Sequence, residues 1–148
     1  MEQQNGSMLL KVMSIIMMIA GIVGAVASFI VAIVVGFLQT AVVVASADGQ
    51  SVKGAGPVMG LLWAGVIILV AGAVIEIIAG VKGKKNWNNP AQAQTLMIWG
   101  IVAAVISLIG NILFSTGTQS VQFFTILSGL VVPVLYIVGT VQLKNQAQ

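Results

Sequence analysis

The chain has 148 residues, of which 59% are hydrophobic and only 6% are charged, whereas about a quarter of an ordinary soluble sequence is charged. A mean hydropathy of +1.11 excludes a water-soluble globular domain, and the absence of cysteine and histidine excludes disulfides, thiolate nucleophiles and the commonest metal ligand. The net charge of +3 comes from lysines without any arginine, which is too little positive charge to predict a nucleic-acid site.

The first predicted element is a long apolar segment that follows Lys11 and continues to Val44. It exceeds the roughly 20 residues that a helix needs to cross a bilayer, and we expect a membrane helix over about residues 9–44. Residues 45–47 (Ala-Ser-Ala) resemble a signal-peptidase site, so cleavage is an alternative. The apolar core is about twice as long as that of a signal peptide, which favours a retained membrane helix.

Two further helices follow on either side of a polar segment. Glycines and Pro57 mark a loop, and the sequence predicts a second helix over about residues 58–81. The polar segment 82–90 ends in Pro90, a residue that fits the start of a helix. A third helix is expected over about residues 92–114.

The fourth predicted helix covers about residues 121–143. It contains Pro133, which cannot donate a hydrogen bond to the carbonyl of Gly129 and therefore permits a bend. Gly129 and Pro133 are a candidate hinge, with a static kink as the alternative. The expected fold is all-α: an integral membrane bundle of four transmembrane helices that forms a single domain over residues 1–148.

The lysines lie mostly on one side of the predicted spans. That side holds Lys11, Lys82, Lys84, Lys85 and Lys144, and the other side holds Lys53 and Asp48. Cytoplasmic flanks of membrane helices carry an excess of lysine and arginine. We therefore expect a multi-pass protein of the cell membrane with its N-terminus and C-terminus in the cytoplasm.

The first and third predicted helices resemble each other. Residues 18–30, MIAGIVGAVASFI, align without gaps with residues 97–109, MIWGIVAAVISLI, and nine of the thirteen positions are identical. A duplication would give two tandem helical hairpins of the same orientation, related by an axis along the membrane normal. The alternative is that two helices with similar packing roles converged on similar residues.

Small residues recur on the first two predicted helices at spacings that favour close helix packing in lipid. The predicted packing positions are Ala20, Gly24, Ser28, Ala32 and Gly36 on the first helix, and Gly65, Gly72 and Gly80 on the second. We expect another helix, from this chain or from a partner, to lie along these positions.

Three polar residues form a candidate intramembrane site. Glu76 is the only ionisable residue deep within a predicted helix, which is by default a functional hypothesis. Tyr136 lies at a similar depth and could donate a hydrogen bond to the carboxylate, and Lys11 could reach it by snorkelling. Asn111 is expected to turn inward, because an unpaired amide in hydrocarbon is costly. The alternative is that these residues only stabilise packing.

The central segment GKKNWNNPAQAQ, which leads into LMIWGIVAAVISLIG, resembles that of small four-helix bacterial membrane proteins of unknown function. The resemblance covers most of the chain. It implies a four-span bundle in the bacterial inner membrane, and it transfers no functional residue.

No nucleotide-binding loop, zinc-protease motif or paired carboxylates are present in the sequence. We therefore expect no enzymatic activity, no cofactor and no metal. The predicted function is non-enzymatic and acts through helix–helix contacts, as an oligomer or as an accessory subunit of a membrane complex. The alternatives are a small transporter or channel whose path Glu76 lines, and a pore-forming or immunity-type membrane protein. The expected partners are the lipid bilayer and other membrane helices, from copies of this chain or from a partner protein, and no nucleic acid.

Overall fold

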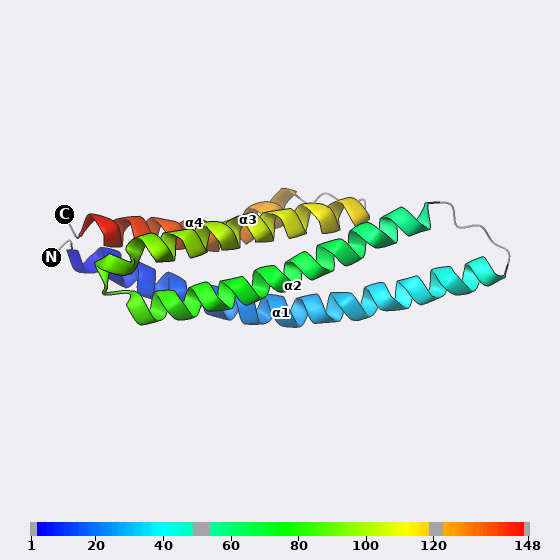
Figure 1. Ribbon diagram of the computed structural model, residues 1–148, viewed down its shortest axis with the longest axis horizontal. Coiled ribbons are helices and arrows are strands. Elements are labelled where there is room, and N and C mark those ends of the chain that lie inside the picture. The colour runs from blue at the N-terminus through cyan, green and yellow to red at the C-terminus, as the bar shows by residue number, and fades with distance from the viewer. Residues whose placement is uncertain (1–2, 49–53, 119–122, 147–148) are drawn as a thin grey trace.

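The computed structural model describes residues 3–48, 54–118 and 123–146, and almost all of these residues are helical (Figure 1). The elements are α1 (Gln3–Ala47), α2 (Ala55–Asn86), the short 3-10 helix η1 (Pro90–Gln92), α3 (Ala93–Thr118) and α4 (Phe123–Asn145). The expected all-helical fold with four long helices is therefore confirmed.

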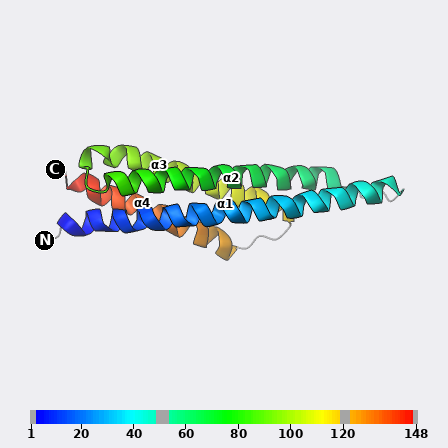
Figure 2. The same ribbon diagram turned by 90° about the horizontal axis from the view of Figure 1, so that it is seen from below.

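The four helices form an up-and-down bundle in which each helix packs against the next one along the chain and α1 also packs against α4. Both ends of the chain and the turn between α2 and α3 lie at the same end of the bundle (Figures 1 and 2). This end carries Lys11, Lys82, Lys84, Lys85 and Lys144, and we call it the lysine end.

Three helical stretches are long and apolar enough to cross a membrane: Met8–Ala47, Ala55–Asn86 and Pro90–Leu113. The described part of α4 contains a shorter apolar stretch, Gly129–Asn145. The fourth membrane span therefore stays a prediction, because its predicted beginning at residues 121–122 lies outside the described residues.

The helices are longer than hydropathy predicts. α1 continues to Ala47, and α2 continues through the polar lysine segment as far as Asn86. Hydropathy marks where the apolar surface ends, whereas a helix ends where its backbone hydrogen bonds stop. Lys84 and Lys85 lie in the last turn of α2, where a positive charge interacts favourably with the helix dipole. Pro57 is tolerated in the first turn of α2, because the backbone N–H that proline lacks has no partner there.

The apolar core consists of two clusters. The cluster at the lysine end takes buried side chains from all four helices, namely Leu10, Met17, Ala79, Ala93, Leu96, Ala103, Tyr136 and Leu143. The second cluster is built around Val35, Leu62 and Val66, and its described residues all belong to α1 or α2. Among the described residues, all four helices contribute at the lysine end, and only α1 and α2 reach the opposite end (Figure 1).

The α1–α2 hairpin extends well past the ends of α3 and α4 (Figures 1 and 2). Gly72 of α2 lies against Ser107 of α3, and Gly110 of α3 lies against Leu69 of α2. Counting on from these contacts, the last turn of α3 is level with the region around Trp63. We call residues 37–47 of α1 and 55–63 of α2 the distal hairpin.

Candidate functional site

Glu76 is bound by the neighbouring helix α3. The hydroxyl of Ser107 donates a hydrogen bond of 2.9 Å to Oε1 of Glu76. Gly72, one turn earlier on α2, also faces Ser107, since a Cβ atom there would lie in ordinary contact distance, 3.4 Å, of Oγ of Ser107. The sequence did not single out Ser107 as a site residue. The one signal for it was its match to Ser28 in the internal repeat.

Asn111 lies half-buried one turn from Ser107 on the same helix. Its side-chain nitrogen donates to the backbone carbonyl of Ser107 at 2.8 Å, a local bond that polar side chains within helices often form. A Cβ atom on Gly129 of α4 would lie 3.8 Å from this nitrogen. Asn111 therefore faces α4, and Glu76, Ser107 and Asn111 form a polar layer from α2 to the edge of α4.

Tyr136 does not contribute to this polar layer. Its fully buried side chain donates a hydrogen bond of 3.0 Å to the backbone carbonyl of Ala79, so the hydroxyl is not directed at the carboxylate of Glu76, the acceptor that the sequence left possible. The reason is steric. The Tyr136 ring fills the space beside Gly83 and Gly100, where a Cβ atom would lie 2.7 Å and 2.8 Å from ring carbons. On α2, Gly83 is about two turns nearer the lysine end than Glu76.

Lys11 is also not directed at Glu76. Its ammonium nitrogen lies 4.7 Å from the centre of the Trp87 ring, and that of Lys82 lies 4.4 Å from the centre of the Trp99 ring. Both are cation–π contacts. The lysine end thus combines lysines with tryptophans, a combination typical of a membrane–water interface.

At the lysine end, the predicted packing positions hold α1 against α2. A Cβ atom on Gly80 would lie 2.7 Å from backbone atoms of Ser14 and Met18. Gly21, which was not among the predicted positions, lies in α1 against the backbone of α2, where a Cβ atom would lie 2.9 Å from the carbonyl oxygen of Ala73. Ala20, half-buried, is next to it in the chain. These contacts leave no room for a partner helix here.

The same stripe of small residues behaves differently further from the lysine end. Ser28 is buried and donates to the carbonyl of Gly24, and Gly65 is buried as well. Ala32 packs on the second core cluster. Gly36, the last position of the stripe, has nothing within 4 Å of the place that its Cβ atom would take. Helix α2 of the same chain therefore fills most of the predicted groove, and only its end is free.

The internal repeat can be compared with the packing of the two hairpins. Gly21 lies against Ile77 of α2, and its counterpart Gly100 lies against Tyr136 of α4. Each repeated glycine therefore approaches the helix that follows it in the chain. The repeated serines differ, because Ser28 bonds to its own helix whereas Ser107 bonds to Glu76.

The predicted hinge lies inside a continuous helix. α4 runs without a break through Pro133, whose side chain is fully buried. Gly129 is exposed, so it is free of the tight packing seen at the lysine end. Movement at these two residues stays a prediction.

Comparison with protein-family models, with curated proteins and with solved structures finds no match for this chain. In the part of the chain that the structure describes, no three potential His, Cys, Asp or Glu ligands gather at one place. The function must therefore be argued from the polar layer and from the helix surfaces.

Proposed function

We propose that this chain is an integral protein of the cell membrane, with both termini in the cytoplasm, that acts through helix–helix contacts. It works without enzymatic chemistry, as an oligomer or as an accessory subunit of a membrane complex. The observation that carries this proposal is the distal hairpin, a two-helix extension that continues past the described ends of α3 and α4 (Figure 1) and exposes apolar side chains. The lysines at one end support the orientation.

The length of α1 indicates that the hydrocarbon of the bilayer does not surround the whole helix. Its 45 residues span about 67 Å at 1.5 Å per residue, whereas the hydrocarbon core of a bilayer is about 30 Å thick. Fitting the whole helix into hydrocarbon requires a tilt of about 60°, and membrane helices tilt by about 40° at most. Part of α1 therefore extends beyond the lipid tails.

Two pairs of side chains suggest where the hydrocarbon begins and ends. At the lysine end, Lys82 stacks on Trp99. At the opposite boundary, the indole nitrogen of Trp63 donates a hydrogen bond of 2.7 Å to the side chain of Gln39. Lys82 and Trp63 are separated by about 28 Å along α2, which matches the thickness of the hydrocarbon core. On this assignment the distal hairpin lies at the outer face of the membrane.

The surface of the distal hairpin is apolar. Phe37 is 74% exposed, Leu38 50%, Val43 61% and Val44 56%. Outside the hydrocarbon these side chains would meet water, at a cost of about 25 cal/mol for each Å² of apolar surface. Large exposed apolar patches commonly mark sites of protein association. A partner protein or a second copy would remove this cost.

The test is the composition of the purified particle. The protein is extracted in a mild detergent, transferred to lipid nanodiscs, and examined by native mass spectrometry together with whatever co-purifies. The proposal expects a defined oligomer or a partner in constant ratio. A strict monomer that co-purifies with nothing would remove its support.

The polar layer favours a second candidate function, a small transporter or channel. Glu76 lies about 9 Å from Lys82 along α2, and its carboxylate is held at the contact with α3 by Ser107. This candidate predicts that Glu76→Gln changes ion flux into proteoliposomes while expression and thermal stability stay the same. Loss of stability together with flux would indicate a packing role.

A further inference from the structure

Four lysines lie at nearly the same height at the lysine end. Three of them, Lys82, Lys84 and Lys85, lie in the last two turns of α2. The ammonium of Lys11 lies over the ring of Trp87, two residues after Lys85. The rise from Lys82 to Trp87 is about 8 Å, and the headgroup region on each side of a bilayer is about 5 to 8 Å thick. Since the assigned hydrocarbon ends at Lys82, these lysines occupy one headgroup layer.

Among the described residues, no acidic side chain lies beside these lysines. Asp48 follows α1 at the opposite end of the bundle. Glu76 lies about 13 Å deeper than Lys85 and on the opposite side of α2, where its carboxylate accepts a hydrogen bond from Ser107. Glu2, the third acid of the sequence, lies outside the described residues. A single acid cannot balance the lysines, so this end carries a net positive charge.

An apolar stripe on the surface of α2 leads to Lys85. Its members are exposed side chains at helical spacing, namely Ile67, Val70, Val74, Ile78 and Val81. Residues at this spacing share one face of a helix, and Lys85, four residues after Val81, continues that face. α1 packs against α2 at Ala73, and α3 packs against it at Gly72. The stripe therefore lies on a side of α2 that neither neighbour covers.

The stripe is long enough for the acyl chains of one leaflet. From Ile67 to Val81 it measures about 21 Å, whereas one leaflet fills about half of the 30 Å hydrocarbon core, or about 15 Å. An acyl chain that begins at the assigned boundary can therefore stay in contact with α2 through the whole leaflet. The headgroup of the same lipid then lies at Lys85.

Lys82 is the neighbour of Lys85 on the surface of α2. Residues three apart on a helix have Cβ atoms about 5 to 6 Å apart. The ammonium nitrogen of Lys82 lies 4.4 Å from the centre of the Trp99 ring, and this cation–π contact orders the side chain without removing its charge. A lysine ammonium has three hydrogen-bond donors, so both lysines can donate to one phosphate.

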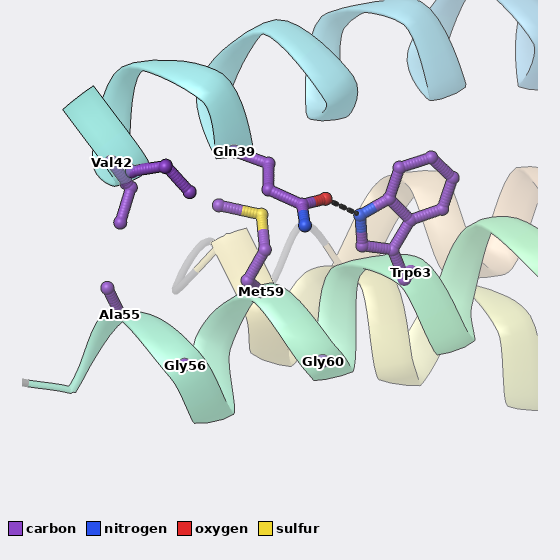
Figure 3. A pocket seen from close by; sticks show the side chains of 8 residues that line it. Gln39, Val42, Ala55, Gly56, Met59, Gly60 and Trp63 are labelled. Atoms are coloured by element: carbon purple, nitrogen blue, oxygen red, sulfur yellow. Dashed lines mark hydrogen bonds between the residues drawn. The ribbon is translucent and has the colours of Figure 1, made fainter.

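The opposite boundary of the assigned hydrocarbon is marked by uncharged side chains. There Gln39 accepts the hydrogen bond of Trp63 (Figure 3). The residues that line the adjoining groove between α1 and α2 are all uncharged as well. Attraction to anionic headgroups is therefore expected in one leaflet only, at the lysine end.

We propose that Lys82 and Lys85 bind the phosphate of an anionic phospholipid, whose acyl chains lie along the stripe from Val81 to Ile67. A phospholipid fits both parts of this surface, because its headgroup meets the lysines and its chains meet the apolar side chains. An acidic protein segment or a nucleic acid would match the lysines alone. This inference rests on the membrane assignment of the proposed function and goes beyond its helix contacts.

Native mass spectrometry of the full chain tests the lipid preference. The protein is purified in a neutral detergent and titrated with phosphatidylglycerol or with phosphatidylcholine that has the same acyl chains. Both lipids contain a phosphate, but only phosphatidylglycerol has a net negative charge. It is expected to bind about tenfold more tightly, since each lysine near an anionic surface contributes severalfold. Equal affinities for the two lipids would overturn the proposal.

Lys85→Gln and Lys84→Gln are a matched pair of variants. Both lysines are exposed in the last turn of α2, and each variant removes one charge. Lys84 lies on the side of α1, because Gly80, one turn earlier, contacts α1. Lys85→Gln is expected to weaken phosphatidylglycerol binding about fivefold, the usual contribution of one lysine near an anionic surface, and Lys84→Gln about twofold or less. Equal losses would indicate diffuse attraction and overturn the site.

Lys82→Gln tests the second cation. It is expected to weaken phosphatidylglycerol binding about as much as Lys85→Gln, and the double variant should bind the two lipids equally. Because Lys82 also contacts Trp99, thermal stability is measured alongside, and the pair at Lys84 and Lys85 decides if Lys82→Gln unfolds the protein. A preference for phosphatidylglycerol that survives in the folded double variant would contradict the assignment.

Glycerol phosphate separates a lipid site from a site for free phosphate. It carries the charged group without acyl chains, so it cannot use the apolar stripe. At equal concentration it is expected to leave bound phosphatidylglycerol in place. Displacement of the lipid by glycerol phosphate under these conditions would overturn the lipid as the occupant.

The outcomes separate this inference from the proposed function. A defined oligomer without a preference for phosphatidylglycerol would overturn the lipid site and leave the proposed function standing. A strict monomer that binds phosphatidylglycerol through Lys85 would do the reverse. An acidic protein or a nucleic acid bound at the lysine end in place of lipid would overturn the site, and recovery of the chain dissolved in water without detergent would remove both.

Discussion

The glycines at the lysine end are packed tightly against neighbouring helices, whereas the glycines near and within the distal hairpin have open space around them. At the lysine end, a Cβ atom would lie within about 3.0 Å of a neighbouring helix at Gly80, Gly83, Gly100 and Gly139. Near and within the distal hairpin, nothing lies within 4 Å at Gly36, Gly56 and Gly60. The presence of a small residue in an apolar helix therefore does not show whether another helix of the same chain packs against it.

The difference assigns different roles to the two regions. Close backbone approach at the lysine end joins all four helices around Tyr136 and makes this region the stable part of the fold. The distal hairpin leaves its small residues unused, and its apolar surface is available for association. Substitutions should therefore affect folding at one end and assembly at the other, and the following experiments test that division.

The largest effect is expected for Gly80→Ala. The new Cβ atom would lie 2.7 Å from backbone atoms of Ser14 and Met18, and backbone cannot move aside as a flexible side chain can. We expect a loss of about 3 kcal/mol, the upper part of the usual cost of overpacking. The free energy of unfolding is measured by titration with a denaturing detergent. An unchanged value would show that α1 and α2 are not in contact there.

Tyr136→Phe should have a smaller effect. It removes the hydrogen bond to the carbonyl of Ala79 and keeps the ring beside Gly83 and Gly100. A net loss of about 1 kcal/mol is expected for one buried hydrogen bond. The same unfolding titration measures it, and circular dichroism should show unchanged helix content. A loss as large as that of Gly80→Ala would contradict this view of the hydroxyl.

Much of the fold could be predicted from the sequence, but the side-chain contacts of the candidate site could not. Apolar runs predict the helices, and the positions of the lysines predict the lysine end. They do not give the helix ends, because polar residues such as Lys84 continue the helix. Nor do they give side-chain pairs. The acceptor of Tyr136 is Ala79, a backbone carbonyl that no residue type indicates.

Ser107 illustrates the same limit. Glu76 is evident in the sequence as a single acid in an apolar helix, but its partner depends on the rotation of α3 relative to α2. The distal hairpin was predicted only in part: hydropathy makes the first helix, about residues 9–44, longer than the third and fourth, but it does not show which helix lies beside its far end. Helix periodicity shows which residues share one face of a helix, whereas only the packed structure shows which faces of two helices contact each other.

Ser107→Ala should cost less than Tyr136→Phe. The change removes the hydroxyl that donates to Glu76 and creates little empty space. Hydrogen bonds between membrane helices contribute about 0.6 kcal/mol on average, and we expect a loss of this size in the unfolding titration. Thr116→Ala is the control, because the exposed hydroxyl of Thr116 donates only to its own helix. Equal losses in the two variants would show that the bond to Glu76 contributes nothing to stability.

The smallest effect on stability, and one of opposite sign, is expected for Gly36→Ala. The methyl group has open space around it, and replacing a helical glycine by alanine stabilises a helix by roughly 0.5 kcal/mol. The monomer in detergent should therefore become slightly more stable, whereas Gly80→Ala destabilises it. In nanodiscs the same methyl group is expected to weaken any helix association that uses the open end of the small-residue stripe at Gly36. A variant that folds better but associates less separates folding from assembly at a single residue, and destabilisation of the monomer would mean that Gly36 is packed within the chain.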